Sequence, residues 1–229
     1  MIFIPGLDAP PVMWIDYVDT LEKKFSGKNN TEIRVIKNGR YNGNQPFEDT
    51  IIPIVSMCEK YCKLNPNRKI SVIGTSLGGK AAVTLEHRLR QKGFSNKMQV
   101  VSISGAFGTS LVTWGNKIVA EINKRWYLRW LQKLVDAYIH RSLRTDLSIA
   151  VNNTLVEEIN KNKTNHDENT CRIFISGMDE TCVWPPSRCH PKVDINDVHY
   201  KIPVAGHIST TMKSLDLVCD NIESFTNTA

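Results

Sequence analysis

Residues 69–83 read KISVIGTSLGGKAAV, and they decide the fold of the chain. The first part is a short apolar run rich in β-branched residues, which favour a buried strand. After the glycine-bracketed turn at residues 74–79, the composition is helical as far as about Gln91. The segment therefore predicts a strand, a sharp turn and a helix in immediate succession.

The turn contains the pattern Gly74-x-Ser76-x-Gly78. A serine between a strand and a helix projects its hydroxyl only if the chain reverses sharply, which strains the serine backbone. Such a reversal leaves no space for side chains two positions on either side, and glycine meets that requirement. The pattern is typical of a serine that acts as a nucleophile.

The same residues nearly match a phosphate-binding loop, Gly74-x-x-x-x-Gly79-Lys80, which also lies between a strand and a helix. In that motif the next residue is Ser or Thr, whose hydroxyl holds Mg²⁺, and here it is Ala81. Either pattern arises by chance in roughly one chain in twenty or fewer at ordinary glycine frequencies, so the rest of the sequence must decide between them.

The composition bounds the class of protein. The chain has 229 residues, of which 41% are hydrophobic and 23% charged, which fits one globular domain. No apolar run approaches the roughly 20 residues of a membrane helix. The apolar residues 1–4 end at Pro5-Gly6 without a preceding basic segment, so no secretory signal is recognised. We expect a cytoplasmic protein, unless a leader lies outside this sequence.

Neither the charge nor the cysteine content indicates binding of nucleic acid, a metal or an organic cofactor. The net charge is +6, which favours anionic substrates or membrane surfaces, but no basic stripe interleaved with aromatic residues suggests nucleic-acid binding. The six cysteines lack the density of a disulfide scaffold. Cys182, Cys189 and His190 form only a loose group, and we interpret these cysteines as free thiols.

Strands and helices alternate along the chain. Strands are expected at residues 2–4, 32–36, 68–73, 98–103, 172–176 and 199–204. Helices are expected at residues 12–25, 47–64, from the serine turn to about residue 91, and 209–225. Strands separated by helices form βαβ crossovers. The sequence therefore predicts one α/β domain over residues 1–229, with a mostly parallel six-stranded sheet and helices on both faces.

Residues 105–170 interrupt this alternation and are expected to form a helical cap between the fourth and fifth strands. Within them, residues 116–140 carry apolar side chains at steps of three or four, including Trp126 and Trp130. This apolar stripe either packs on the core or faces the active site or a lipid surface. The second alternative would make Trp126 and Trp130 substrate-contacting residues and would allow peripheral membrane contact.

A nucleophilic serine needs a base that takes its proton and a carboxylate that orients the base. In a parallel sheet these groups belong on loops at the carboxyl ends of strands. Asp179 follows the expected fifth strand, and His207 follows the sixth. The chain order is Ser76, Asp179, His207.

Each partner has rivals. Glu180 could replace Asp179, although the offset of Asp179 from Gly177 favours the aspartate. His199 lies inside an expected strand and His190 in a Pro/Cys-rich loop, so neither lies where the base should be. Two further histidines lie on expected helices and are predicted to be solvated: His87 and His140.

This arrangement resembles the α/β-hydrolase superfamily over nearly the whole chain. Residues 3–7, with Trp14 at the next helix, look like the family's oxyanion loop. Gly177-x-Asp179, with the nearby Val183, Pro185 and Pro186, looks like its acid loop, and Gly206-His207 like its histidine loop. Two features depart from the family pattern: one or two strands usually precede the oxyanion loop, and many members have His-Gly at Pro5-Gly6.

The resemblance implies a serine hydrolase for an ester or thioester, of lipase, carboxylesterase or acyl thioesterase type. It implies an oxyanion hole formed by the backbone N–H groups of Leu7 and Leu77. The substrate would be a small-molecule or lipid acyl ester, and no cofactor is implied. A noncatalytic receptor or interaction protein of the same fold is the alternative, and a nucleotide-binding protein is the weaker one.

Overall fold

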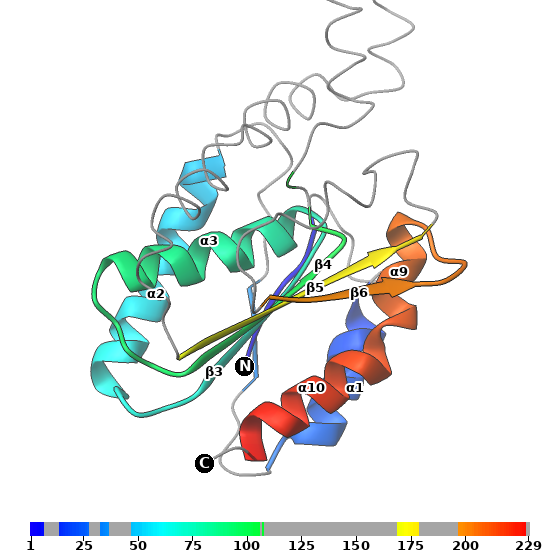
Figure 1. The fold of residues 1–229 in the computed structure, drawn as a ribbon. Coiled ribbons are helices and arrows are strands. Elements are labelled where there is room, and N and C mark those ends of the chain that lie inside the picture. The colour runs from blue at the N-terminus through cyan, green and yellow to red at the C-terminus, as the bar shows by residue number, and fades with distance from the viewer. Residues whose placement is uncertain are drawn as a thin grey trace, which may run out of the picture.

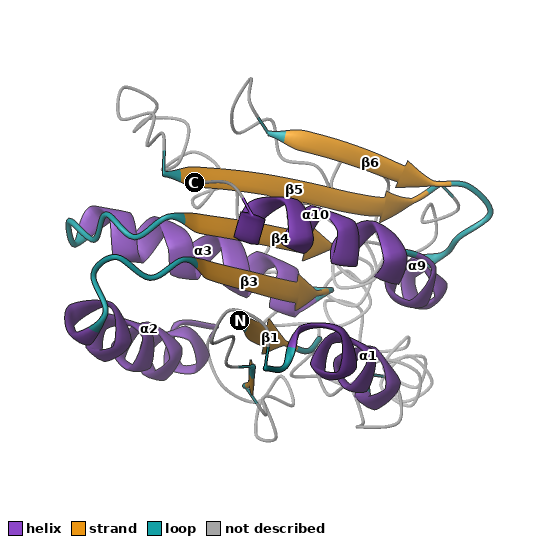
Figure 2. Ribbon diagram, turned by 90° about the horizontal axis from the view of Figure 1, so that it is seen from below, coloured by secondary structure: helices purple, strands orange, loops and turns teal. Residues whose placement is uncertain are grey.

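The computed structural model describes residues 1–6, 14–27, 33–36, 47–105, 107, 169–178 and 197–227. They form a parallel six-stranded sheet with helices on both faces (Figures 1 and 2). The strands are β1 (Ile2–Ile4), β2 (Arg34–Val35), β3 (Ile70–Thr75), β4 (Met98–Ile103), β5 (Thr170–Gly177) and β6 (Val198–Ile202). The helices are α1 (Ile15–Phe25), α2 (Phe47–Leu64), α3 (Leu77–Gln91), α9 (His207–Lys213) and α10 (Leu215–Asn227).

The strand order is β2-β1-β3-β4-β5-β6, and every neighbouring pair is parallel. From β1 the chain moves outward to β2, then crosses to the other side of β1 to form β3. The direction of winding therefore reverses between β1 and β3. In open parallel sheets, ligands bind outside the carboxyl ends of the strands at such a reversal point.

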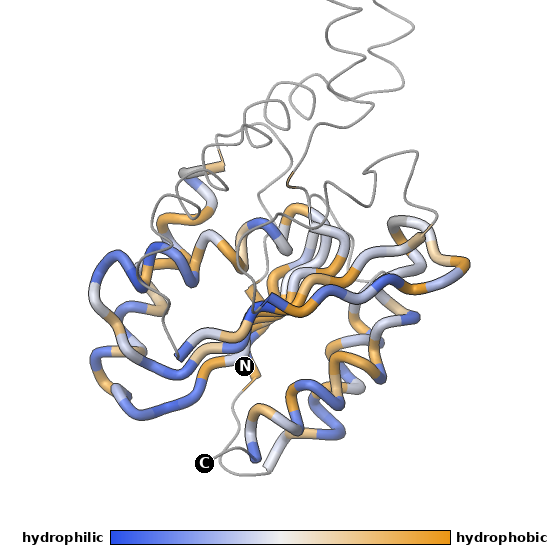
Figure 3. The backbone as a smooth tube through the Cα atoms, viewed as in Figure 1, coloured by the Kyte–Doolittle hydropathy of each residue, from blue (hydrophilic) through white to orange (hydrophobic). Residues whose placement is uncertain are grey.

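Alternating side chains of the strands divide the core into two layers. Val72 and Val100 pack with α2 and α3, whereas the next residues, Ile73 and Val101, pack with α1 and α10 on the opposite face. Successive residues of a strand point to opposite faces, so a sheet covered on both sides needs continuous apolar strands. Figure 3 shows apolar residues concentrated along the strands.

The predicted α/β architecture is confirmed, with four corrections. The third strand extends through Thr75 to the serine itself instead of ending at Ile73. The last helix is two helices, α9 and α10, separated at Ser214. His87, predicted to be solvated, is buried at 5% exposure because α3 is covered over most of its surface. The strand expected over residues 32–36 is only the two residues of β2.

A buried ion network fixes α3 to β5. The Glu86 carboxylate is fully buried and accepts hydrogen bonds from Arg172 Nε at 3.0 Å and Thr170 Oγ1 at 3.2 Å. Arg90 forms an ion pair with Glu86 at 3.6 Å and donates to the carbonyl oxygens of Phe94, Asn96 and Asn169. The buried charges are therefore paired and hydrogen-bonded, as burial requires.

Removing one member of this network leaves buried charges without their partner. We expect Glu86→Ala to lower the free energy of unfolding by about 3–5 kcal/mol, measured by urea denaturation. Glu59→Ala is the matched control, because Glu59 pairs with Lys92, whose side chain is 51% exposed. The control should lose no more than about 1 kcal/mol, and equal losses in the two variants would contradict the role of the network.

Candidate active site

Ser76 forms a strained junction between β3 and α3. Its backbone has φ 54° and ψ −124°, a region that non-glycine residues seldom occupy. Its N–H donates to the Ile103 carbonyl oxygen at the end of β4, at 2.8 Å, and its own carbonyl accepts from Gly79 N–H at 2.9 Å. Ser76 is the only residue from 70 to 87, all of which are described, that is not buried. The sharp reversal thus brings one hydroxyl-bearing residue to the surface of a buried segment.

The flanking glycines are required by close backbone contacts. A Cβ atom on Gly74 would overlap the carbonyl of Gly78, and one on Gly78 would overlap the carbonyl of Ile4 and lie 2.6 Å from the Pro5 oxygen. Neither glycine has the positive φ that would itself favour glycine. The predicted lack of space two positions either side of Ser76 is confirmed.

The segment after β1 lies directly beside Ser76. A Cβ atom on Gly6 would lie 3.0 Å from Ser76 Cβ and 3.6 Å from Ser76 Oγ. β1 and β3 are neighbours in the sheet, and the winding reverses between them, so this contact lies where α/β sheets bind ligands. Leu77 begins α3 on the other side of Ser76, and the first N–H groups of a helix have no partner within the helix.

The segments after β5 and β6 also meet at this edge. A Cβ atom on Gly177, the last residue of β5, would overlap the carbonyl of Ala205, two residues before His207. Met178 N–H donates to the Ile202 carbonyl at 3.0 Å. Gly206 then caps α9, accepting from Thr210 N–H at 3.0 Å and from Thr210 Oγ1 at 2.7 Å. The backbone contact therefore fixes the residues that immediately precede Asp179 and His207 against one another.

Backbone strain gathers at the same edge of the sheet. Among the described non-glycine residues, those with positive φ are Ser76 at 54°, Ser104 at 52° and Val204 at 50°. They follow the carboxyl ends of β3, β4 and β6 respectively. Strained backbone tends to cluster at active and binding sites, so this edge is the candidate site on geometry alone.

Comparison with known proteins gives the fold its name. No protein-family model and no curated protein matches the sequence. Solved structures do match. Superposition on the monoacylglycerol lipase of Paleococcus ferrophilus gives a TM-score of 0.60 at 14% identity, covering 98% of this chain and 93% of the lipase. The chain has the α/β-hydrolase fold.

Two further solved structures with this fold also match. The peroxisomal α/β-hydrolase Lpx1 of Saccharomyces cerevisiae matches with a TM-score of 0.58 at 16% identity, covering 100% of this chain and 77% of its own. A structure from a study of carboxylesterases of Nitrososphaera gargenis also matches. Its TM-score is 0.56 at 13% identity, covering 98% of this chain and 90% of its own. The structural neighbours with this fold thus include esterases and lipases.

Three of the predicted site residues lie at this edge within the described part of the chain. Ser76 and Leu77 lie at the junction of β3 and α3, and the backbone of His207 begins α9. Leu7 and Asp179 lie outside the described residues, next to Gly6 and Met178 respectively. Outside them too are the rival residues Glu180 and His190 and the cap residues Trp126 and Trp130. The rival His199 lies within β6 and stacks on Phe174, with ring centroids 5.2 Å apart.

The Lys80 side chain does not lie where a phosphate-binding lysine would. Its side chain is buried at 5% exposure, and Nζ lies 5.2 Å from the centroid of the Phe47 ring on α2. A phosphate-binding lysine must instead reach into the loop to contact the nucleotide. The position of Lys80 therefore agrees with the nucleophile interpretation of this turn rather than the nucleotide-binding one.

Sequence reasoning missed two features of the site. Ser104 is buried at 1% exposure and follows β4, and its strain had no glycine pattern to reveal it. Four exposed apolar side chains also lie near the strand ends, on the β5 and β6 loops and on α9: Met178, Val204, Ile208 and Met212. Ile208 and Met212 are four residues apart on α9, so they share one helix face.

The described part of the chain holds no cluster of metal-ligating side chains. There, no three His, Cys, Asp or Glu side chains come close enough to hold an ion. No described helix is long and apolar enough to cross a membrane.

The contact between Gly177 and Ala205 can be tested by adding one methyl group. We expect Gly177→Ala to lower the free energy of unfolding by about 1–3 kcal/mol, because the new Cβ overlaps the Ala205 carbonyl. Gly206→Ala is the control, since a Cβ there meets nothing within 4 Å, and its loss of capping should cost less than about 1 kcal/mol. Chemical denaturation measures both, and a neutral Gly177→Ala would refute the tight junction.

Proposed function

We propose that the protein is a serine hydrolase that cleaves carboxylic esters or thioesters. The observation that carries the proposal is Ser76. It is a strained, half-buried serine at the winding reversal of the sheet, beside Gly6 and at the start of α3. The esterases and lipases among the structural neighbours support the same class of chemistry.

The proposed reaction uses Ser76, His207, Asp179 and water. His207 takes the Ser76 hydroxyl proton as Oγ attacks the acyl carbon, and Asp179 orients the imidazole and stabilises its charge. The tetrahedral oxyanion accepts hydrogen bonds from the backbone N–H groups of Leu7 and Leu77. His207 then protonates the leaving alcohol or thiol. Water, deprotonated by the same histidine, releases the acid from Ser76.

The acyl group of the proposed substrate is apolar. Val204 is 76% exposed and Ile208 66% exposed beside the strand ends, where an acyl chain could cover them. The helical cap at residues 105–170, with Trp126 and Trp130, belongs to the same proposal as a second apolar surface. Lipid and small-molecule acyl esters both fit this description.

The nucleophile is tested by substitution. Ser76→Ala should lower the turnover of a short p-nitrophenyl ester by about three orders of magnitude or more, because the acyl-enzyme can no longer form. Ser56→Ala is the matched control, since Ser56 is exposed on α2, and it should retain normal turnover.

Labelling by a fluorophosphonate probe separates an active hydrolase from a noncatalytic protein of the same fold. The wild-type protein and Ser56→Ala should react, and Ser76→Ala should not. Near-normal ester turnover by Ser76→Ala would sink the assignment. Absence of both turnover and labelling in the wild-type protein would favour the noncatalytic alternative.

Substrate preference tests the exposed apolar group. Ile208→Asp should lower kcat/KM for a long-chain ester at least tenfold more than for a short-chain ester, because only the long chain reaches α9. Leu64→Asp is the control, since Leu64 is 81% exposed at the last residue of α2, the opposite end of that helix from Phe47 and Lys80. Equal losses on both substrates would show that Ile208 does not contact the acyl chain.

A further inference from the structure

The turn after β4 places a second strained serine beside the candidate nucleophile. β4 lies between β3 and β5 in the sheet, and the three strands end at the same edge (Figure 2). Ser76 N–H donates to the carbonyl of Ile103, the last residue of β4, at 2.8 Å. Ser104, one residue further on, donates its N–H to the Ile175 carbonyl of β5 at 2.7 Å. Adjacent strands lie about 4.8 Å apart, so Ser104 lies about one strand spacing from Ser76, on the side of the strand that leads to Asp179.

The residues that follow Ser104 hold it in its strained conformation, with φ 52°. Phe107 N–H donates to the Gly105 carbonyl at 3.1 Å, and the Phe107 ring packs edge-on against Phe174 of β5, with ring centroids 5.8 Å apart. A Cβ atom on Gly105 would lie 2.4 Å from both Phe107 Cε2 and Ser102 Oγ. The turn is therefore anchored in the hydrophobic core, and its surroundings fix the position of Ser104.

The hydroxyl of Ser104 has no structural explanation within this turn. Ser104 is 1% exposed, and its Oγ has no hydrogen-bond partner in the described part of the chain. Burying a hydroxyl without a hydrogen bond costs free energy, and native proteins keep few such groups. Alanine would fill nearly the same space without that cost. The hydroxyl therefore opposes folding at a place where the backbone is also strained, and this combination is typical of a functional site.

Two observations favour the catalytic acid as the group on which this hydroxyl acts. A serine that is 1% exposed is closed to the substrate, unlike Ser76. Ser104 is also bonded to β5, and Asp179 follows the end of that strand by two residues. A carboxylate has several acceptor sites, and hydrogen bonds to a charged acceptor are stronger than neutral ones.

We propose that Ser104 is a positioning residue whose hydroxyl donates a hydrogen bond to the Asp179 carboxylate. This bond holds the carboxylate toward His207, so that the imidazole is oriented to take the Ser76 proton. The inference rests on the hydrolase function proposed above. Ser104 does not touch the ester, and it acts only through the acid.

The kinetics of Ser104→Ala with a short p-nitrophenyl ester test the proposal. Its kcat should fall at least tenfold while KM stays within twofold of the wild-type value, because the hydroxyl acts on the carboxylate and not on substrate binding. Its melting temperature should be no lower than that of the wild type, because alanine leaves no buried hydroxyl to satisfy. Ser104→Gly removes the same hydroxyl and tolerates a φ of 52°, so it replaces Ser104→Ala if that variant does not fold.

Ser102→Ala is the matched control. Ser102 is also fully buried, and its Oγ also has no partner in the described part of the chain. It lies within β4 rather than beyond the carboxyl end of the strand. Ser102→Ala should therefore keep both kcat and KM within twofold of the wild-type values. An equal fall in kcat in the Ser102 and Ser104 variants would overturn the proposal, because loss of either buried hydroxyl would then have the same effect.

A double substitution tests the partner of Ser104. In protein that carries Asp179→Ala, adding Ser104→Ala should change kcat less than twofold further, because the group that Ser104 positions is gone. An equal tenfold loss in both backgrounds, or normal turnover by Ser104→Ala, would overturn the proposal and leave the ester hydrolysis standing. Absence of both turnover and fluorophosphonate labelling in the wild-type protein would instead overturn the hydrolase function, and the role of Ser104 with it.

Discussion

The structure depends on close backbone contact around the turn that carries Ser76. Gly78 packs against the Ile4 carbonyl, and Gly74 packs against Gly78, with no space for a side chain at either position. The Ser76 N–H bonds to Ile103, so the same turn also connects β3 to β4. The strained backbone of Ser76 persists because these contacts overdetermine it. The turn formed by Gly74, Ser76 and Gly78 thereby holds the carboxyl ends of β1, β3 and β4 together.

Two buried polar side chains of α3 fix the position of the helix that follows this turn. Lys80 lies against the Phe47 ring of α2, and Glu86 binds Arg172 of β5 through a buried ion pair. One polar side chain thus contacts the neighbouring helix and the other contacts the sheet. Because a buried charge is costly without its partner, these contacts favour one orientation of α3 over others. The orientation of α3 in turn sets the position of Ser76 at its first turn.

Backbone contacts of this kind also explain how the fold persists at low sequence identity. The chain superposes on a lipase with a TM-score of 0.60 although only 14% of residues are identical. The continuous apolar strands need only hydrophobic side chains of suitable volume. By contrast, glycine is needed where chains meet closely, as at Gly78 and at Gly177 against Ala205. Gly78 and Gly177 both lie at the carboxyl edge of the sheet, so this requirement for glycine coincides with the candidate site.

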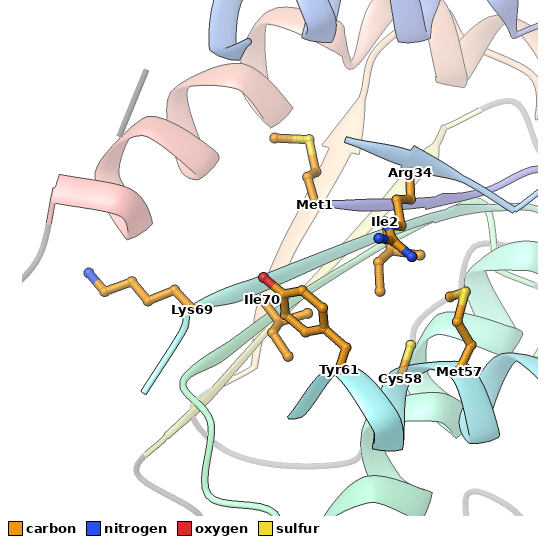
Figure 4. A pocket seen from close by; sticks show the side chains of 8 residues that line it. All are labelled: Met1, Ile2, Arg34, Met57, Cys58, Tyr61, Lys69 and Ile70. Carbon is orange, nitrogen blue, oxygen red and sulfur yellow. The ribbon is translucent and has the colours of Figure 1, made fainter. Parts of the chain in front are cut away.

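The sequence by itself determined the strand-turn-helix at Ser76, the alternation that makes a parallel sheet, and the Asp179 and His207 candidates, because these depend on local pattern and chain order. Only the tertiary structure decided that Gly6 lies beside Ser76, that His87 is buried, and that Ser104 and Val204 share the strained edge. The small cavity beside the amino ends of β1 and β3 (Figure 4) also matches no local motif, since its lining comes from β1, β2, β3 and α2 and the residues next to them. Contacts between segments far apart in the chain leave no periodic signal in the sequence, and they exist only once the sheet has formed.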